Sequence, residues 1–186
     1  MIVLLIVIAA LVLYTIAAYN SLVSAKNQVD NAWRQIDVQL KRRHDLIPNL
    51  VEAVKGYMSF ERDTLTQVVE ARAKALNAPD QASRMAAENQ ITAGMGKLLA
   101  VMENYPQLKS DQSVMQLQEE LTTTENQIAF SRQAYNDAVL TLNTKTERFP
   151  GNIIATNFGF KGAEYFKAAP EDSSVPKVDL GLTPRA

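Results

Sequence analysis

The sequence contains no cysteine and a single histidine, His44, which restricts the chemistry open to it. Without cysteine, disulfide and thiolate chemistry are excluded. One histidine with no cysteine beside it makes a poor metal site, because the common transition-metal sites draw on several nitrogen or sulfur ligands. We therefore predict no metal site and no bound cofactor.

The sequence also lacks an excess of either charge, with 19 basic and 20 acidic residues. A general nucleic-acid binder is expected to be basic, so we predict no nucleic-acid partner. No glycine-rich phosphate loop, serine elbow or dinucleotide fingerprint occurs. His44 lies beside Asp45 but has no nucleophile near it in the sequence, and nothing indicates burial of the adjacent Glu119 and Glu120. We predict that the protein is not an enzyme and has no catalytic residues.

The first 25 residues lack any charged side chain. As a helix, Met1 to Ala18 would be ~27 Å long at ~1.5 Å per residue, close to the ~30 Å hydrocarbon core of a bilayer. Tyr14 and Tyr19 stand near its end, where aromatic rings prefer the membrane interface. We predict that residues 1–20 form a transmembrane anchor in contact with lipid. The alternative is a cleaved signal peptide, which the missing basic start and the length of the apolar run disfavour.

The basic residues follow the anchor and do not precede it. Lys26 and Arg34 are the first of them. The positive-inside rule then places the N-terminus outside and the body in the cytoplasm.

The body has the pattern of long amphipathic helices. From Val29 to Val68, apolar residues recur mostly at spacings of three and four, which gives one apolar stripe. Since short connections favour antiparallel neighbours, we predict an all-α fold, with the anchor continuing into an up-and-down bundle of about four long helices over residues 21–149.

The expected breaks are at prolines and polar loops. Pro48 either kinks the first helix or opens a second one that ends near Leu76. A third helix is expected from Asp80 to about Asn104, and a fourth from about Gln112 to Arg148.

The C-terminal part is expected to differ from the bundle. Residues 150–169 contain several aromatic side chains and should form a short irregular or helical segment packed on the bundle. Residues 170–186, rich in proline, serine and charge, are predicted to be a flexible tail.

Three places are candidates for contacts. The first is the basic cluster Lys41, Arg42 and Arg43, which could bind a lipid headgroup, bind an acidic partner or pair inside the bundle with residues such as Glu52. A straight helix would hold Arg42 ~33 Å from the membrane surface, several times the Debye length of ~8 Å. A lipid contact there would require a bend or a neighbouring subunit.

The other two candidates are a hinge and an aromatic contact. Asp45 and Pro48 lie in the segment DLIPNLV and form either a hinge or a structural break. Trp33 is either a core anchor or a contact between subunits of an oligomer.

Several stretches of the body resemble one protein family. They are AWRQIDVQLKRRHDLIPNLVEAVKGY from Ala32, YPQLKSDQ from Tyr105, LQEELTTTENQIAFSRQAYNDAV from Leu117 and FPGNIIA from Phe149. Together they resemble the LemA family over about residues 19–166. Members often carry His-Glu where this chain has Phe60-Glu61, so the resemblance assigns no metal or acid–base role at that position.

The resemblance implies a single-pass protein of the bacterial cytoplasmic, or inner, membrane. It also implies a relationship to the magnetosome protein MamQ, which is linked to vesicle formation, and an association with membrane metalloproteases. We predict a non-enzymatic scaffold that self-associates as a homo-oligomer or docks other membrane proteins. The alternatives are an adaptor or regulator of a membrane metalloprotease, and a membrane-shaping protein.

Overall fold

The structure, a computed structural model, describes residues 1–58 and 61–167. Within these ranges it contains helices and no strand: Ile2–Val54 (α1), Arg62–Leu76 (α2), Gln81–Met102 (α3), the 3-10 turn Leu108–Ser110 (η1), Gln112–Glu147 (α4) and Gly151–Phe158 (α5). The predicted all-α bundle with a long apolar N-terminal helix is confirmed. Phe60 and the expected flexible tail at 170–186 lie outside the described residues.

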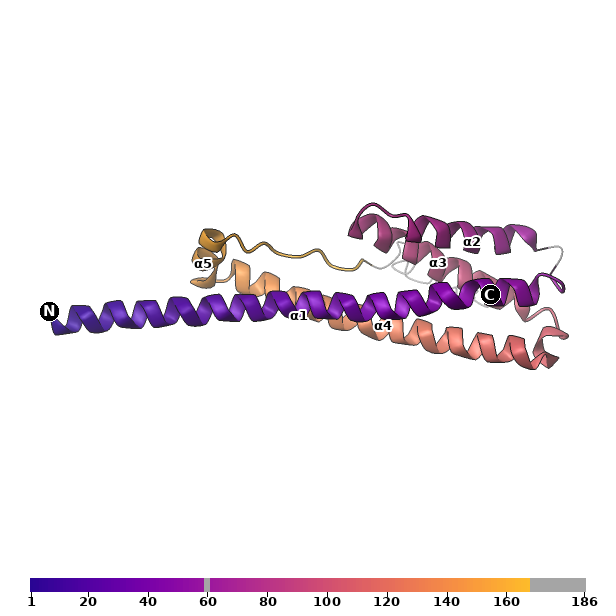
Figure 1. The fold of residues 1–186 in the computed structure, drawn as a ribbon, viewed down its shortest axis with the longest axis horizontal. Helices are drawn as coiled ribbons and strands as arrows, with labels where there is room; N and C mark the ends of the chain where they lie inside the picture. Colours follow the sequence, from indigo (N-terminus) through magenta and orange to yellow (C-terminus); the bar gives the residue numbers. More distant parts are fainter. Residues whose placement is uncertain (59–60, 168–186) are drawn as a thin grey trace, which may run out of the picture.

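The frame of the molecule is an antiparallel pair formed by α1 and α4 (Figure 1). The apolar N-terminal part of α1 projects beyond the pair. Along the pair, one core cluster joins Ala25, Val29, Ala32, Ile36 and Leu40 of α1 to Ile128, Tyr135, Val139 and Leu142 of α4. The α1 residues recur at spacings of three and four, so the pair packs like a short coiled coil.

The helices α2 and α3 form a hairpin against the far end of this pair (Figure 1). A second core cluster there draws buried residues from all four long helices, among them Ile47, Leu50, Val68, Ile91, Leu98 and Leu121. The bundle has four helices only at this end, away from the apolar segment.

The sequence left two alternatives open at Pro48, a kink in the first helix or the start of a second one. The helix α1 runs through Pro48 to Val54, so the second alternative is wrong. The turn instead lies around Gly56, a residue that destabilises helices by about 1 kcal/mol relative to alanine. The expected helix from Asn49 to Leu76 is therefore divided between α1 and α2.

The other boundaries follow local capping. The Asp80 carboxylate accepts the Ser83 N–H at 2.7 Å at the start of α3, and the Asp111 carboxylate accepts the Ser113 N–H at 3.0 Å at the start of α4. Such N-caps satisfy backbone donors that the first turn leaves free. The helix α4 ends at Glu147, just before Phe149-Pro150-Gly151, as predicted.

After α5 the chain returns along α4 without regular structure, through residues 160–167, here called the strap. The Asn143 side chain accepts the Ala163 N–H at 2.9 Å and donates to the Ala163 carbonyl at 3.0 Å. Asn136 makes the same pair of bonds to Phe166, at 2.8 and 3.1 Å. Seven helical residues cover ~10.5 Å, and three extended residues cover about the same at ~3.4 Å each, so both asparagines stay in register with the strap.

Candidate functional site

The most polar place inside the molecule is an ionic cluster in the bundle, formed by Arg43, His44, Glu88, Thr92 and Glu125. Arg43 is fully buried on α1, where the core stripe would otherwise be apolar. Its guanidinium donates to Glu125 at 2.8 and 3.1 Å and to the Thr92 hydroxyl at 2.8 Å. A short ion pair also links it to Glu88 of α3, which is itself fully buried. One arginine thereby joins α1, α3 and α4.

His44 completes the cluster from the next position on α1. Its Nε2 lies 3.0 Å from a Glu88 carboxylate oxygen. Burial raises the pKa of Glu88, but the interaction with His44 and the charges of Arg43 and His44 outweigh burial, so this pKa lies below its usual value. The Glu88 carboxylate is therefore ionised at neutral pH, and the Arg43 guanidinium balances its charge.

The ionic cluster is suited to a structural role. Its two carboxylates are held by Arg43, and Glu88 and Arg43 have no exposed surface on which a substrate could bind. Buried ion pairs add little net stability compared with apolar residues, but losing one partner is costly. A single polar layer in an apolar helix pair can fix its register. The cluster accordingly acts here to fix how α1, α3 and α4 align.

A second polar contact explains how α1 continues through Pro48. Proline has no backbone N–H, so the carbonyl of His44, four residues earlier, loses its helical partner. Arg72 of α2 supplies the missing donor, with its Nε 2.8 Å from that carbonyl oxygen. Because a guanidinium replaces the lost bond, the proline is held inside a continuous helix, and α2 is tied to α1 at that point.

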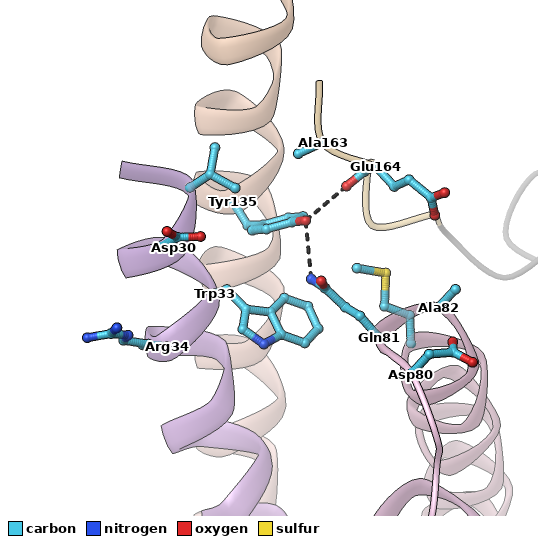
Figure 2. Close-up of a pocket in the computed structure, with 11 residues that line it drawn as sticks. Asp30, Trp33, Arg34, Asp80, Gln81, Ala82, Tyr135, Ala163 and Glu164 are labelled. Carbon is cyan, nitrogen blue, oxygen red and sulfur yellow. Dashed lines mark hydrogen bonds between the residues drawn. The ribbon is translucent and has the colours of Figure 1, made fainter. Parts of the chain in front are cut away.

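The third site is a pocket of about 520 Å³ beside Trp33, where α1, the start of α3, α4 and the strap meet (Figure 2). The Trp33 ring packs edge-on against Tyr135, with centroids 5.5 Å apart, and lies 6.4 Å from the Phe166 ring. The Tyr135 hydroxyl donates to the Glu164 carbonyl at 2.9 Å and accepts from Gln81 at 3.3 Å, as Figure 2 shows.

The groups that line this pocket are suited to binding another molecule through hydrogen bonds and charge. Burial raises the pKa of Tyr135, and the nearby Glu164 and Asp30 carboxylates raise it further, so the phenol remains a protonated hydrogen-bond donor. Asp30, Asp80 and Glu164 line the pocket together with Arg34. In the part of the chain that the structure describes, no group of three or more histidine, cysteine or acidic side chains could hold a metal ion.

The predicted contact residues do not gather into one site. Lys41 and Arg42 are exposed, whereas Arg43 points into the core, so a lipid or partner contact at Arg43 is wrong. Its internal partners are Glu88 and Glu125, and the suggested Glu52 pairs with Lys55 instead. The hinge candidates Asp45 and Pro48 are exposed on the unbroken α1.

Trp33 is half-buried between Tyr135, Phe166 and the pocket. This position fits the interpretation as a core anchor. The part of the ring that faces the pocket also leaves room for a contact with another molecule.

Several functional residues were missed by the sequence reasoning, chiefly Glu88, Glu125 and Arg72. A signal for them was present. Arg43 falls on the apolar stripe seven residues from Ile36 and Leu50, so a carboxylate was needed inside the bundle. Pro48 likewise required a donor for the carbonyl four residues before it.

The comparisons with known proteins agree with the resemblance seen in the sequence. The sequence model of the LemA family matches residues 32–180. The chain is 28% identical to Protein LemA of Metamycoplasma hominis over 162 residues, which cover 87% of this chain and 72% of that protein. It is 24% identical to Magnetosome protein MamQ 2 of Paramagnetospirillum magneticum, with 88% and 70% covered. It is 22% identical to Magnetosome protein MamQ of Magnetospirillum gryphiswaldense, with 89% and 72% covered.

The first part of α1 is long and apolar enough to cross a membrane, and none of that stretch is buried against the rest of the described structure. A core helix of a soluble protein would be mostly covered. The family match extends over most of the chain. The chain therefore belongs to the LemA family and is a membrane-associated helical protein.

Proposed function

We propose that the protein is a non-enzymatic scaffold, anchored in the bacterial cytoplasmic membrane by residues 1–20, that self-associates and docks other membrane proteins. The observation that carries the proposal is the continuity of α1, which has 53 residues and a length of ~80 Å at ~1.5 Å per residue. One helix thus belongs both to the membrane anchor and to the bundle core, and it holds the bundle at a fixed distance from the bilayer.

The internal contacts support a rigid role for the body. The ionic cluster fixes α1 against α3 and α4, and Arg72 braces α1 at its only internal proline. Arg43 and Glu88, the two fully buried charged groups of the cluster, are paired with each other. We place the N-terminus outside and the bundle in the cytoplasm, because the first basic residues, Lys26 and Arg34, follow the apolar segment.

Two surfaces are proposed for docking. The exposed Lys41 and Arg42 lie on the long rod of α1, and the pocket beside Trp33 opens where α1, α3 and the strap meet. The pocket carries three carboxylates and one arginine, so a basic side chain of a partner would be complementary to it.

The test is extraction of the full chain from its native membrane in lipid-preserving particles, followed by measurement of mass and composition. A particle larger than one chain and containing only this chain supports a homo-oligomeric scaffold. A stoichiometric second protein supports docking, and a membrane metalloprotease in that position would favour the adaptor alternative. Particles that hold a single chain and no second protein would overturn the scaffold.

Matched variants locate the contact in the same experiment. Reversing the exposed charges, Lys41→Glu with Arg42→Glu, should reduce particle mass or partner content if these residues dock a partner. Lys109→Glu is the control, because Lys109 is also exposed but lies on a different element, η1, which packs near the C-terminal end of α1.

Membrane shaping is a second proposed function, favoured by the similarity to magnetosome proteins. It predicts that the purified full chain changes the size or curvature of liposomes. Unchanged vesicles at high protein density would overturn it.

A further inference from the structure

A short helix crosses α1 where the apolar segment ends. Ile154 and Ala155 of α5 pack against Leu22 of α1, and Phe158 at the end of α5 lies edge-on to Tyr19, with ring centroids 5.0 Å apart. The start of α5 meets the same part of α1, next to Ser21 and Leu22. The contacts of α5 with α1 fall on a short stretch of α1 around Tyr19 and Leu22, and Figure 1 shows the short α5 beside the longer α1.

The outer side of this corner is apolar. Phe149 is 75% exposed and Ile153 53%. Phe158 is 57% exposed although its ring packs against Tyr19, on the same side of α5 as the buried Ile154 and Ala155. The exposed parts of these three large apolar side chains lie on one short stretch, here called the patch, and exposed apolar surface of this kind can mark an interaction site. The patch lies level with Tyr14 to Leu22, next to the apolar segment.

The same corner carries basic side chains. Lys26, Lys145, Arg148 and Lys161 lie within residues 1–30 and 145–164, together with the acidic Asp30, Glu147 and Glu164. The Lys145 ammonium donates to the Ser21 hydroxyl at 2.9 Å, which places it beside the end of the apolar segment.

A hollow of about 410 Å³ lies between these basic and apolar groups. Lys145 and Arg148 line it together with Tyr14, Ala18 and Phe149. It therefore combines cations that can bind a phosphate with an apolar wall on the side of the membrane segment.

We propose that this corner is a lipid-binding collar, composed of Lys145, Arg148, Phe149, Ile153, Phe158 and Lys161. It binds the bilayer interface, with anionic phosphate headgroups against its cations and its apolar side chains in the upper acyl region. The proposal rests on α1 spanning the membrane and adds a second lipid contact around its exit point. Basic and aromatic residues at the interface are attracted to it by anionic headgroups and by the amphipathic environment.

The lipid surface is favoured as the occupant because the patch continues directly from the apolar segment that the bilayer would cover. A helix that leaves the membrane near residue 20 holds Leu22 within ~3 Å of that level. The part of the collar beside Leu22 thus lies well inside the ~8 Å over which charges interact at physiological salt. Lys41 and Arg42, which the sequence analysis considered for lipid contact, lie far outside that range.

The test uses single cysteines, which the cysteine-free chain allows without any background label. The full chain carrying Phe149→Cys or Ile153→Cys is labelled with a polarity-sensitive dye and reconstituted in phosphatidylcholine vesicles containing phosphatidylglycerol. Both labels should be quenched by lipids brominated near the headgroup end of their chains. The control is Met115→Cys, an equally exposed apolar site at the far end of α4, which should not be quenched.

A further label separates the two ways in which the proposal can fail. Ile8→Cys reports on the anchor itself. If the Ile8 label is quenched deep in the bilayer while the collar labels stay in water, the collar proposal is overturned and the anchored scaffold stands. If the Ile8 label is also in water, the anchor that both proposals need is overturned.

The role of the charges is measured separately. Arg148→Gln with Lys161→Gln should lower the enrichment of fluorescent phosphatidylglycerol around the protein about fivefold for each charge removed. Both side chains are exposed, so the fold should be retained, which Trp33 fluorescence checks. Equal enrichment in the variant and the parent protein would overturn the headgroup contact.

Discussion

Replacing Arg72 with methionine is expected to destabilise the bundle, because it leaves the His44 carbonyl without a donor. That carbonyl has no helical partner, since Pro48 lacks an N–H, and the Arg72 Nε at 2.8 Å is its replacement. A hydrogen bond made by a charged group contributes about 1.5–3 kcal/mol. We therefore expect Arg72→Met to cost about 2 kcal/mol in the free energy of unfolding.

The distinctive result comes from combining this change with Pro48→Ala. The second change restores a backbone N–H at position 48, so the His44 carbonyl no longer depends on Arg72. Proline in a helix interior costs about 3 kcal/mol relative to alanine, so Pro48→Ala alone should be stabilising. In that background Arg72→Met should cost much less, with an interaction energy between the two sites of about 1–2 kcal/mol.

Thermal unfolding of the full chain in detergent, followed by far-ultraviolet circular dichroism, measures all four proteins of this cycle. At about 2–4 °C per kcal/mol, Arg72→Met should lower the melting temperature by about 4–8 °C. Arg62→Met, at an exposed position of the same helix, is the control. If Arg72→Met costs the same with and without Pro48, the replacement of the lost bond is refuted, and Arg72 acts only through packing.

Three further perturbations test the other contacts. Arg43→Met should cost about 3–5 kcal/mol, because it removes the ion-pair partner of Glu125 and of the buried Glu88, whereas Arg42→Met at the exposed neighbour should be nearly neutral; urea unfolding compares them, and equal costs would contradict the ionic cluster. The pKa of Glu88 lies below its usual value. The folding stability that the ionised Glu88 carboxylate contributes is therefore complete above about pH 4.3 and is lost as the pH falls through the lowered pKa. The melting temperature should fall in that acidic range, and less steeply in Glu88→Gln; parallel curves would refute the assignment. Asn143→Ala removes both bonds to Ala163, so hydrogen exchange of the Ala163 amide should accelerate about 2- to 10-fold, and unchanged exchange would show that the strap is held elsewhere.

The general architecture could be predicted from the sequence because it depends on local patterns. The spacing of apolar residues fixed the helical body, and Asp80 and Phe149-Pro150-Gly151 marked helix ends through capping and proline chemistry. The uncharged N-terminal segment identified the apolar helix in the same way.

What the sequence reasoning missed depends on contacts between distant segments. The sequence left open whether Pro48 kinks one helix or opens another, since nothing local shows that Arg72, on another helix, supplies the missing donor. Arg43 was counted with its exposed neighbours, because Glu88 and Glu125 come from helices whose relative placement the sequence leaves open. The position of Phe149 and Ile153 next to the apolar segment depends on where α5 packs on α1, which local sequence patterns do not show.

The unbroken α1 also has a mechanical consequence. With residues 1–20 in the bilayer, as proposed, α1 would extend ~51 Å beyond it from residue 20 to Val54, at ~1.5 Å per residue. Transmembrane helices change tilt to match bilayer thickness, and a tilt of roughly 10° would sweep the far end sideways by roughly 9 Å. In the proposed placement the helix would therefore be a lever arm, which converts small changes in the thickness of the surrounding bilayer into large displacements of the four-helix end.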